Sequence, residues 1–572
     1  MPSSRRQFMS YFSAAGLGGT LFPGTLWTLR HAAGQQTSDD APITVGMIEQ
    51  AEQIAGLTFS PEQRELMVED VNDNLDAILA LRERPLPNET APALIFDPAR
   101  LVPVPPAGPT TVDWQAPGVS KPASSEALAF LPVTELAALM RAGEVTSVEL
   151  TRLYLSRLKQ YDPVLKCVVT LTEERALQQA AERDAELAAG TWRGPLHGIP
   201  WGAKDLLAVE GYPTTWGAVP YQNQVIDQTA EVVKRLDEAG AVLVAKLTLG
   251  ALAWGDVWFG GRTNNPWNIE QGSSGSSAGS GSAVAAGLVG FALGTETLGS
   301  IVSPSTRNGV TGLRPTFGRV SRHGAMALSW SMDKIGPMVR HADDAALVFA
   351  AIHGQDANDP FSRDAAFTWP VDPKSLRVGY FARAFEAERP NANVDAAVLD
   401  VLRGAGFELQ PIDLPANYPL NGLLLTLGVE AAAAFDDLTR SGGTDAMVRQ
   451  IRNAWPNVFR TSRLVPAVEY VQANRLRTQL LHEVERVMEA VDVFVTPSFG
   501  GGVLQITNLT GHPTVVVPNG FLPVEDAPAG SPRRQPTSIS FVAGLDKDAA
   551  ALSVAAAYQA QTDFHRRRPP VG

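Results

Sequence analysis

The sequence predicts an α/β protein in which helices cover both faces of a largely buried sheet. Short apolar runs have the length of buried strands, for example AVLVAKL (241–247), DVFVTPS (492–498) and PTVVVP (513–518). They alternate with longer stretches of helical pattern, and the alternation runs to the C-terminus without a second linker. Strands that alternate with helices are typical of a sheet buried between helical layers.

Residues 1–35 have the pattern of a twin-arginine export signal. Ser4-Arg5-Arg6-Gln7-Phe8-Met9 places paired arginines between a polar residue and two apolar residues, and a modestly apolar stretch follows. That stretch is short and interrupted for a stable membrane span. We therefore expect an exported bacterial protein, periplasmic or extracellular, whose signal is either cleaved or kept as an anchor.

The next two segments differ from the rest of the chain. Residues 36–97 form a predicted N-terminal helical extension, because Ser60 and Pro61 begin a helix. Apolar residues then recur at helical spacing: Val68, Val71, Leu75, Ile78 and Leu79. Residues 98–124 are rich in proline and predict a linker, or a strap that lies on the main body. Residues 125–572 then form one catalytic domain, and the extension could shape its entrance or a homodimer contact.

Composition excludes several functions. The net charge is −13, and the only concentrated basic run is the short tail His565–Arg568, so nucleic acid is not expected as a partner. The single cysteine, Cys167, cannot form an internal disulfide or a cysteine-based zinc site, and its apolar setting predicts a buried thiol. The eight histidines show no metal-binding spacing, so we expect neither a metal nor a cofactor.

The run GSSGSSAGSGS (272–282) is the most unusual stretch of the chain. A flexible linker would be out of place between two apolar, well-patterned segments. A phosphate-binding loop needs a lysine or a glycine spacing that is absent here. A nucleophile elbow is possible, since GSSAG matches G-x-S-x-G with Ser277 as the nucleophile and His512 or His565 downstream. That elbow requires a strand before it, whereas 264–271 has the composition of a loop.

A longer comparison uses five motifs in order along the chain. They are GPLHGIPWGAKDLL (194–207), GSSAGSGSAVAAGLVGFALGTETLGSIVSPS (275–305), GLRPTFGRVSRHG (312–324), MDKIGPMVR (332–340) and NLTGHPTVVVPNGF (508–521). Together they resemble the amidase signature family, and the resemblance covers about residues 125–565. It implies a large mixed central sheet and a Ser–Ser–Lys triad that needs no cofactor.

Carried over residue by residue, the resemblance places the triad at Lys204, Ser276 and Ser300. Ser300 is the nucleophile, Ser276 follows a cis peptide bond and relays a proton, and Lys204 is the base. Backbone N–H groups from Thr297, Leu298, Gly299 and Ser300 would form the oxyanion hole. A base lysine must be neutral, and burial favours the neutral form because desolvation disfavours charge.

The implied activity is hydrolysis of a small or medium-sized non-peptide amide through an acyl-enzyme on Ser300. The chain departs from the family pattern at Glu296, Leu298 and Val302, where aspartate, glycine and arginine are usual. Three alternatives stay open: a glutamine-hydrolysing amidotransferase subunit of the A type, an α/β-hydrolase-like esterase that uses Ser277, and an exported binding protein with an inactive site. Which amide is cleaved, and whether esters are cleaved, does not follow from the sequence.

Overall fold

The computed structural model describes residues 43–54, 108–451, 453–463, 465–524, 527–528 and 530–571, with isolated positions between 60 and 72. The chain divides into two compact units, Met1–Pro85 and Leu86–Gly572. The predicted export signal lies outside the described residues. So does most of the predicted extension and the first part of the proline-rich segment.

The described part of the first unit is helical. Helix α3 spans Val45–Ile54, and the isolated positions from Pro61 to Asn72 are helical as well. The side chain of Asn72 binds the backbone of Ile43 as both donor and acceptor, at 2.9 and 3.0 Å. Arg64 forms an ion pair of 3.1 Å with Glu49. These contacts join the two helical stretches.

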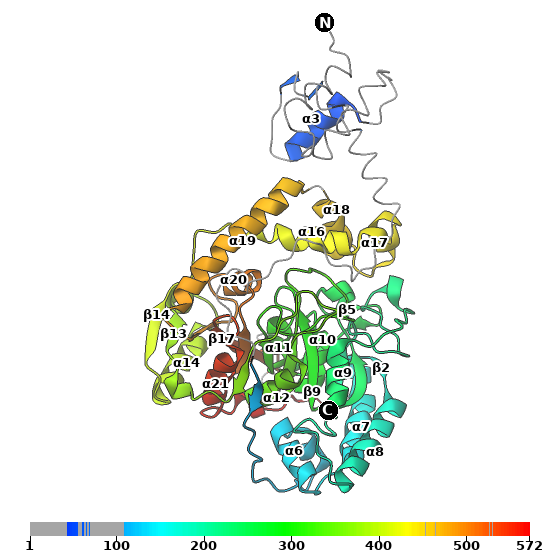
Figure 1. The fold of residues 1–572 in the computed structure, drawn as a ribbon, viewed down its shortest axis with the longest axis vertical. Helices are drawn as coiled ribbons and strands as arrows, with labels where there is room; N and C mark the ends of the chain where they lie inside the picture. Colours follow the sequence, from blue (N-terminus) through cyan, green and yellow to red (C-terminus); the bar gives the residue numbers. More distant parts are fainter. Residues whose placement is uncertain are drawn as a thin grey trace, which may run out of the picture. The chain divides into compact units, whose positions relative to one another are not determined.

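A mixed sheet of eleven described strands forms the centre of the second unit, in the order β14-β13-β15-β17-β16-β10-β11-β9-β3-β4-β2 (Figure 1). The strands are β2 (Val168–Leu171), β3 (Pro200–Lys204), β4 (Val242–Leu247), β9 (Phe291–Glu296), β10 (Thr311–Arg314), β11 (Lys334–Val339), β13 (Val378–Phe381), β14 (Leu409–Ile412), β15 (Val493–Pro497), β16 (Thr514–Pro523) and β17 (Arg534–Ala543). Strand β3 is parallel to β4 and β9, whereas β11 is antiparallel to β9 and β10. The predicted α/β architecture with a mixed sheet is confirmed.

Helices cover both faces of this sheet. The larger ones are α6 (Val133–Arg141), α7 (Ser147–Leu165), α8 (Glu173–Ala188), α9 (Glu231–Glu238), α10 (Ala278–Ala285), α11 (Val302–Asn308), α12 (Ala342–Ile352), α14 (Ala392–Gly404), α16 (Leu425–Ala434), α18 (Trp455–Ser462), α19 (Ala467–Met488), α20 (Val503–Thr510) and α21 (Asp548–Gln559). Successive residues of a strand point to opposite faces. Accordingly Leu293 belongs to the apolar cluster that contains residues of α9, α12 and α21, whereas its neighbour Ala292 belongs to the cluster that contains residues of α7, α8 and α10.

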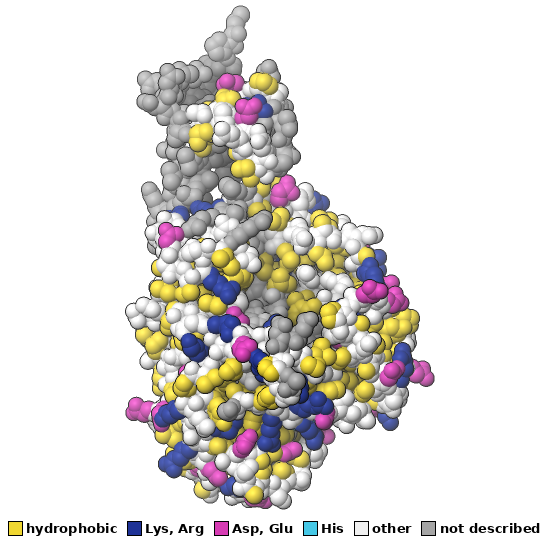
Figure 2. Space-filling model, turned by 180° about the vertical axis from the view of Figure 1, so that it is seen from behind, with side chains coloured by type: hydrophobic (Ala, Val, Ile, Leu, Met, Phe, Trp, Pro, Cys, Tyr) yellow, Lys and Arg dark blue, Asp and Glu magenta, His cyan; other side chains and the backbone are white. Residues whose placement is uncertain are grey.

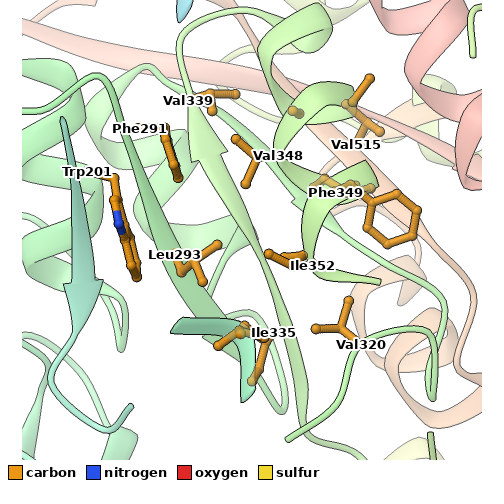
Figure 3. Packing of buried hydrophobic residues seen from close by; sticks show 14 of the residues in the cluster. Trp201, Phe291, Leu293, Val320, Ile335, Val339, Val348, Phe349, Ile352 and Val515 are labelled. Atoms are coloured by element: carbon orange, nitrogen blue, oxygen red, sulfur yellow. The ribbon is translucent and has the colours of Figure 1, made fainter. Parts of the chain in front are cut away.

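The larger apolar cluster lies between the sheet and α12 (Figure 3). Trp201 of β3 stacks on Phe291 of β9, with ring centroids 5.8 Å apart and an angle of 6° between the rings. Val348, Phe349 and Ile352 of α12 pack onto the neighbouring strands. This packing fixes the C-terminal ends of β3 and β9, where the candidate site residues lie.

Part of the proline-rich segment is a strand of the second unit. Strand β1 (Thr110–Val112) pairs in parallel with β12 (Phe367–Trp369), and the N–H of Asp113 continues the ladder to Trp369. The segment from 108 onward therefore lies on the main body.

Charged side chains of both signs are mixed across the face drawn in Figure 2. Among the described helices, none is both long and apolar enough to cross a membrane. Cys167 is completely buried beside β2.

Candidate active site

Lys204 is the last residue of β3, and its side chain is completely buried. Trp201 and Ala203 of the same strand belong to the large apolar cluster, so the alternation of the strand directs Lys204 to the opposite face. That face is covered by α10, whose N-terminus follows Ser276 and Ser277. Strand and helix thus bring the lysine and the two serines together from positions more than 70 residues apart.

Three hydroxyl groups surround the Lys204 amine. Its Nζ lies 2.8 Å from Ser276 Oγ, 3.0 Å from Ser277 Oγ and 2.8 Å from Thr295 Oγ1. The Thr295 carbonyl lies 3.4 Å away. No carboxylate lies within 4 Å of this amine among the described residues. The lysine is therefore held by polar groups that do not require it to carry a charge.

The peptide bond between Gly275 and Ser276 is cis. It follows a short hairpin of β7 (Asn264–Asn265) and β8 (Asn268–Gly272), a stretch that the sequence predicted as loop. Position 275 admits only glycine, because a Cβ there would lie 1.8 Å from the carbonyl oxygen of Gly255. The close approach of residue 255 thus shapes the backbone that presents Ser276.

Ser300 lies in the turn between β9 and α11. Its carbonyl accepts a hydrogen bond of 3.2 Å from the N–H of Ser277, which places it next to Ser276. Its side chain is 8% exposed, and its Oγ has no hydrogen-bond partner among the described residues. The Ser300 hydroxyl is therefore the member of the predicted triad that remains open to a ligand.

The turn that carries Ser300 presents unused backbone donors. Within the described structure, the N–H groups of Thr297, Leu298, Gly299 and Ser300 donate to no other residue. Gly299 has a φ of +86°, in the left-handed region that glycine adopts readily. Four consecutive free N–H groups beside a free hydroxyl form a site that can bind a negatively charged oxygen.

Glu296 closes this turn through its carboxylate. One oxygen accepts from the N–H groups of Ile301 and Val302 at 2.8 and 2.9 Å, and the other accepts from Arg314 and Asn508 at 2.9 and 2.8 Å. Burial alone would raise the pKa of Glu296, but Arg314 and the backbone donors lower it to about 2. Val302 stands where the family has arginine, and the buried guanidinium of Arg314 provides the cation.

Burial lowers the pKa of Lys204 well below its ordinary value, and the charges of Asp333 and Glu296 only partly oppose this effect. Thr297 connects the turn to Asp333, since its hydroxyl donates to that carboxylate at 2.6 Å. Burial raises the pKa of Asp333 and lowers that of its neighbour Lys334. Burial thus favours the neutral form of Lys204, the form that a base requires.

The environment of Ser277 differs from that of an elbow nucleophile. Its hydroxyl donates to the Thr295 carbonyl and accepts from the Thr295 N–H, both at 3.1 Å, in addition to its contact with Lys204. His512 instead contacts Thr510 and Glu485, each at 2.7 Å. The ring of His565 packs edge-on against His341. Neither histidine is a partner of Ser277, so this serine supports the lysine.

Sequence reasoning missed several members of this site. Apart from the elbow alternative, Ser277 was expected to be a loop, packing or hydrogen-bonding residue, and Thr295, Arg314 and Asn508 were assigned no role. All four lie in the family motifs at 275–305, 312–324 and 508–521, which is the signal that could have found them. No group of three or more His, Cys, Asp or Glu side chains in the described ranges is arranged to hold a metal ion.

Comparison with known proteins agrees with these motifs. The model of the Amidase family matches residues 149–528. The A-type subunit of glutamyl-tRNA(Gln) amidotransferase from Roseiflexus sp. (strain RS-1) is 34% identical over 487 residues, which cover 76% of this chain and 96% of that protein. The corresponding subunit from Carboxydothermus hydrogenoformans is 31% identical, and the match covers 77% of this chain and 99% of that protein.

Solved structures show the same fold. The peptide amidase from Stenotrophomonas maltophilia has a TM-score of 0.67 and 31% identity, and the match covers 77% of this chain and 98% of that one. A bacterial aryl acylamidase has a TM-score of 0.66 at 21% identity, over 77% of this chain and 99% of its own.

Proposed function

Because the chain belongs to the amidase signature family, we propose that it hydrolyses the carbon–nitrogen bond of a small or medium-sized non-peptide amide, with Ser300 as the nucleophile. One observation carries the proposal: Lys204 is buried and held by the hydroxyls of Ser276, Ser277 and Thr295, without a carboxylate nearby. A neutral lysine next to a serine relay is suited to remove a proton from a second serine.

The hydrogen bonds of Ser277 orient the lone pair of Lys204. The single proton of the Ser277 hydroxyl is donated to the Thr295 carbonyl, so this hydroxyl can only accept from the lysine. A neutral amine has two N–H groups and one lone pair. When the second N–H is donated to Thr295 Oγ1, the lone pair faces Ser276 Oγ. Ser276 is then the group from which Lys204 takes a proton.

The reaction follows from this order. Ser300 Oγ bonds to the amide carbon while its proton passes to Ser276 and the Ser276 proton passes to Lys204. The negative oxygen that forms is stabilised by free N–H groups among Thr297, Leu298, Gly299 and Ser300, and each donor that binds it contributes about 3 kcal/mol. Lys204 returns the proton through Ser276 to the nitrogen, which leaves as ammonia or an amine. Water then attacks the acyl-enzyme by the same proton path and releases the acid.

The curated relatives support a second candidate. Two of them carry the name of the A-type component of glutamyl-tRNA(Gln) amidotransferase and match over nearly their whole length. The substrate would then be glutamine, and the ammonia would be passed on to another reaction. The first candidate is preferred because the export pattern at Ser4–Met9 does not suit a protein that acts on charged tRNA.

The test is hydrolysis of a panel of aryl amides, aliphatic amides and glutamine by the wild type and Ser300→Ala. Ser280→Ala is the matched control, because Ser280 is buried in α10 and its hydroxyl bonds to the Leu293 carbonyl. Wild type and S280A should form an acyl adduct on the Ser300 peptide by mass spectrometry, and S300A should not.

Activity that survives in S300A would refute this nucleophile. Turnover of glutamine alone would select the second candidate. A wild type inert on the whole panel, and on simple esters, would favour a binding protein.

Export remains part of the proposal. Fractionation of cells that express the full chain should place it outside the cytoplasm. Replacement of Arg5 and Arg6 by lysine should retain it inside.

A further inference from the structure

A cavity of about 100 Å³ borders the nucleophile turn. Its wall includes Thr295 and Thr297 on the side of the triad, and Ala253, Met326, Leu328 and Asp333 elsewhere. A cavity of about 150 Å³ accommodates benzene. At about 100 Å³ this cavity is smaller, so it favours a compact group, for example a branched chain of three or four carbons, over a phenyl ring.

The segment that supplies Ala253 is strained. Leu252 and Ala253 have φ values of +50° and +61°, in the left-handed region that residues with a side chain rarely adopt. Such a conformation is unfavourable for a residue with a side chain and persists only where neighbouring contacts impose it. Leu252 is completely buried and Ala253 is 8% exposed, so both are fixed by packing and hydrogen bonds.

Two tryptophans hold the backbone of Leu252. Its N–H donates to the carbonyl of Trp216 at 2.9 Å. Its carbonyl, which belongs to the peptide unit leading to Ala253, accepts from the indole Nε1 of Trp455 at 2.7 Å. Trp455 is the first residue of α18 and lies 203 residues further along the chain. A side chain of a distant helix thus holds the cavity wall.

The rings around Trp455 fix the direction of its N–H. Trp455 stacks on Phe459 at 5.2 Å with an angle of 9°, and Phe459 stacks on Phe435 at 5.3 Å. Phe435 meets the ring of Trp216 edge-on at 6.0 Å. The rings therefore run from Trp455 through Phe459 and Phe435 to Trp216, and the first and last of these residues are the two that hold Leu252. Aromatic contacts of this kind limit the rotation of each ring.

We propose that Trp455 determines substrate selection: by holding the strained Leu252–Ala253 peptide, it fixes the cavity wall and restricts one substituent of the amide to groups smaller than phenyl. This rests on the proposed amidase function and names the substrate class of the same site. Trp455 touches no reacting atom and acts through Ala253, so it is a positioning residue.

Trp455→Phe tests the proposal, because it keeps the ring and removes the N–H. The matched control is Trp369→Phe, since the indole N–H of Trp369 has no partner among the described residues. Two substrate series separate the sides of the scissile bond: acetyl, isobutyryl and benzoyl anilides, and acetamides of methylamine, isopropylamine and aniline. The cavity takes either the acyl group or the amine, so the preference should appear in one of the two series. In that series, kcat/KM of the wild type and of W369F should be at least tenfold higher for the compact substituent than for the phenyl-bearing one. W455F should reduce that ratio at least fivefold.

A readout without catalysis accompanies the kinetics. Amide hydrogen exchange in peptides that cover residues 250–256 should become faster in W455F and stay unchanged in W369F. If W455F does not fold, Phe459→Leu removes the stacking that orients the indole and should shift the same ratio in the same direction, by a smaller factor.

The outcomes are distinct. Ratios within twofold of wild type in both series, for a folded and active W455F, would overturn the proposal. So would unchanged exchange at residues 250–256. A wild type that cleaves no amide refutes the proposed amidase function, and the exchange result alone then decides whether Trp455 holds this segment.

Discussion

Lys204 and Lys246 lie on the adjacent parallel strands β3 and β4, and both are completely buried, yet their partners differ in kind. Lys246 Nζ lies 2.7 Å from Asp205 Oδ1 and donates to Thr214 Oγ1 and the Pro213 carbonyl, both at 2.9 Å. Lys204 has hydroxyl groups and one carbonyl as neighbours. Asp205 follows Lys204 directly in sequence, but its carboxylate binds the other lysine.

The difference shows that the partner, and not burial alone, decides what a buried lysine can do. Burial lowers the pKa of both amines, and for Lys246 the charge of Asp205 opposes that effect. A lysine in an ion pair is a fixed cation that contributes to the fold. For a lysine among hydroxyls, burial favours the neutral form, which can serve as a base.

Lys204→Met should abolish catalysis while the fold is kept. The variant removes the proposed base, and general base catalysis typically contributes 10²–10⁴-fold, so kcat/KM should fall by about 10⁴. Circular dichroism and the denaturation midpoint should stay close to wild type, because methionine suits a buried site. Activity of K204M within tenfold of wild type would show that another group is the base.

Lys246→Met should have the opposite profile. It leaves Asp205 buried without its cation, which typically costs about 3–5 kcal/mol of the free energy of unfolding. Chemical denaturation measures this loss. The double variant Lys246→Met, Asp205→Leu should be more stable than K246M alone, because no unpaired charge remains. A K246M protein with wild-type stability would contradict the ion-pair assignment.

Wild type and K204M should also differ in how their free energy of unfolding depends on pH. The folded-state pKa of Lys204 lies well below the unfolded value of 10.5, so between these values the unfolded chain binds the extra proton. Stability therefore rises with pH in that window, by up to about 1.4 kcal/mol per pH unit, and activity rises as Lys204 loses its proton. The free energy of unfolding of wild type, minus that of K204M, should increase as the pH rises towards 10.5. A constant difference would mean that Lys204 is charged in the native state.

The sequence predicted the architecture because strand and helix patterns are local. The apolar runs at 241–247, 492–498 and 513–518 correspond to strands β4, β15 and β16. The predicted triad residues Lys204, Ser276 and Ser300 lie close together, as family motifs allow. Local structure departs from the prediction at the hairpin of β7 and β8, whose strands of two and five residues are too short to produce a periodic pattern.

What the sequence could not give are contacts between distant segments. Arg314 reaches Glu296 only because β10 and β9 flank the same strand, β11, a result of topology. Trp455 reaches Leu252 across 203 residues, and neither residue lies in a recognisable motif. Hydrogen bonds of this kind depend on which elements pack together, and they are invisible to spacing arguments.

Thr295→Val provides the finest test of the Lys204 environment. It keeps the β-branched shape on β9 but removes the hydroxyl that lies 2.8 Å from Lys204 Nζ. Without that hydroxyl, the second N–H of the neutral lysine can turn towards Ser276 Oγ in place of the lone pair. The lone pair then faces Ser276 for a smaller share of the time. A hydrogen bond of this kind contributes about 1 kcal/mol, which predicts a fall in kcat of roughly fivefold with little change in KM. Thr295→Ser keeps the hydroxyl and should stay within twofold of wild type. If T295V matches T295S, orientation of the lone pair depends on Ser277 alone.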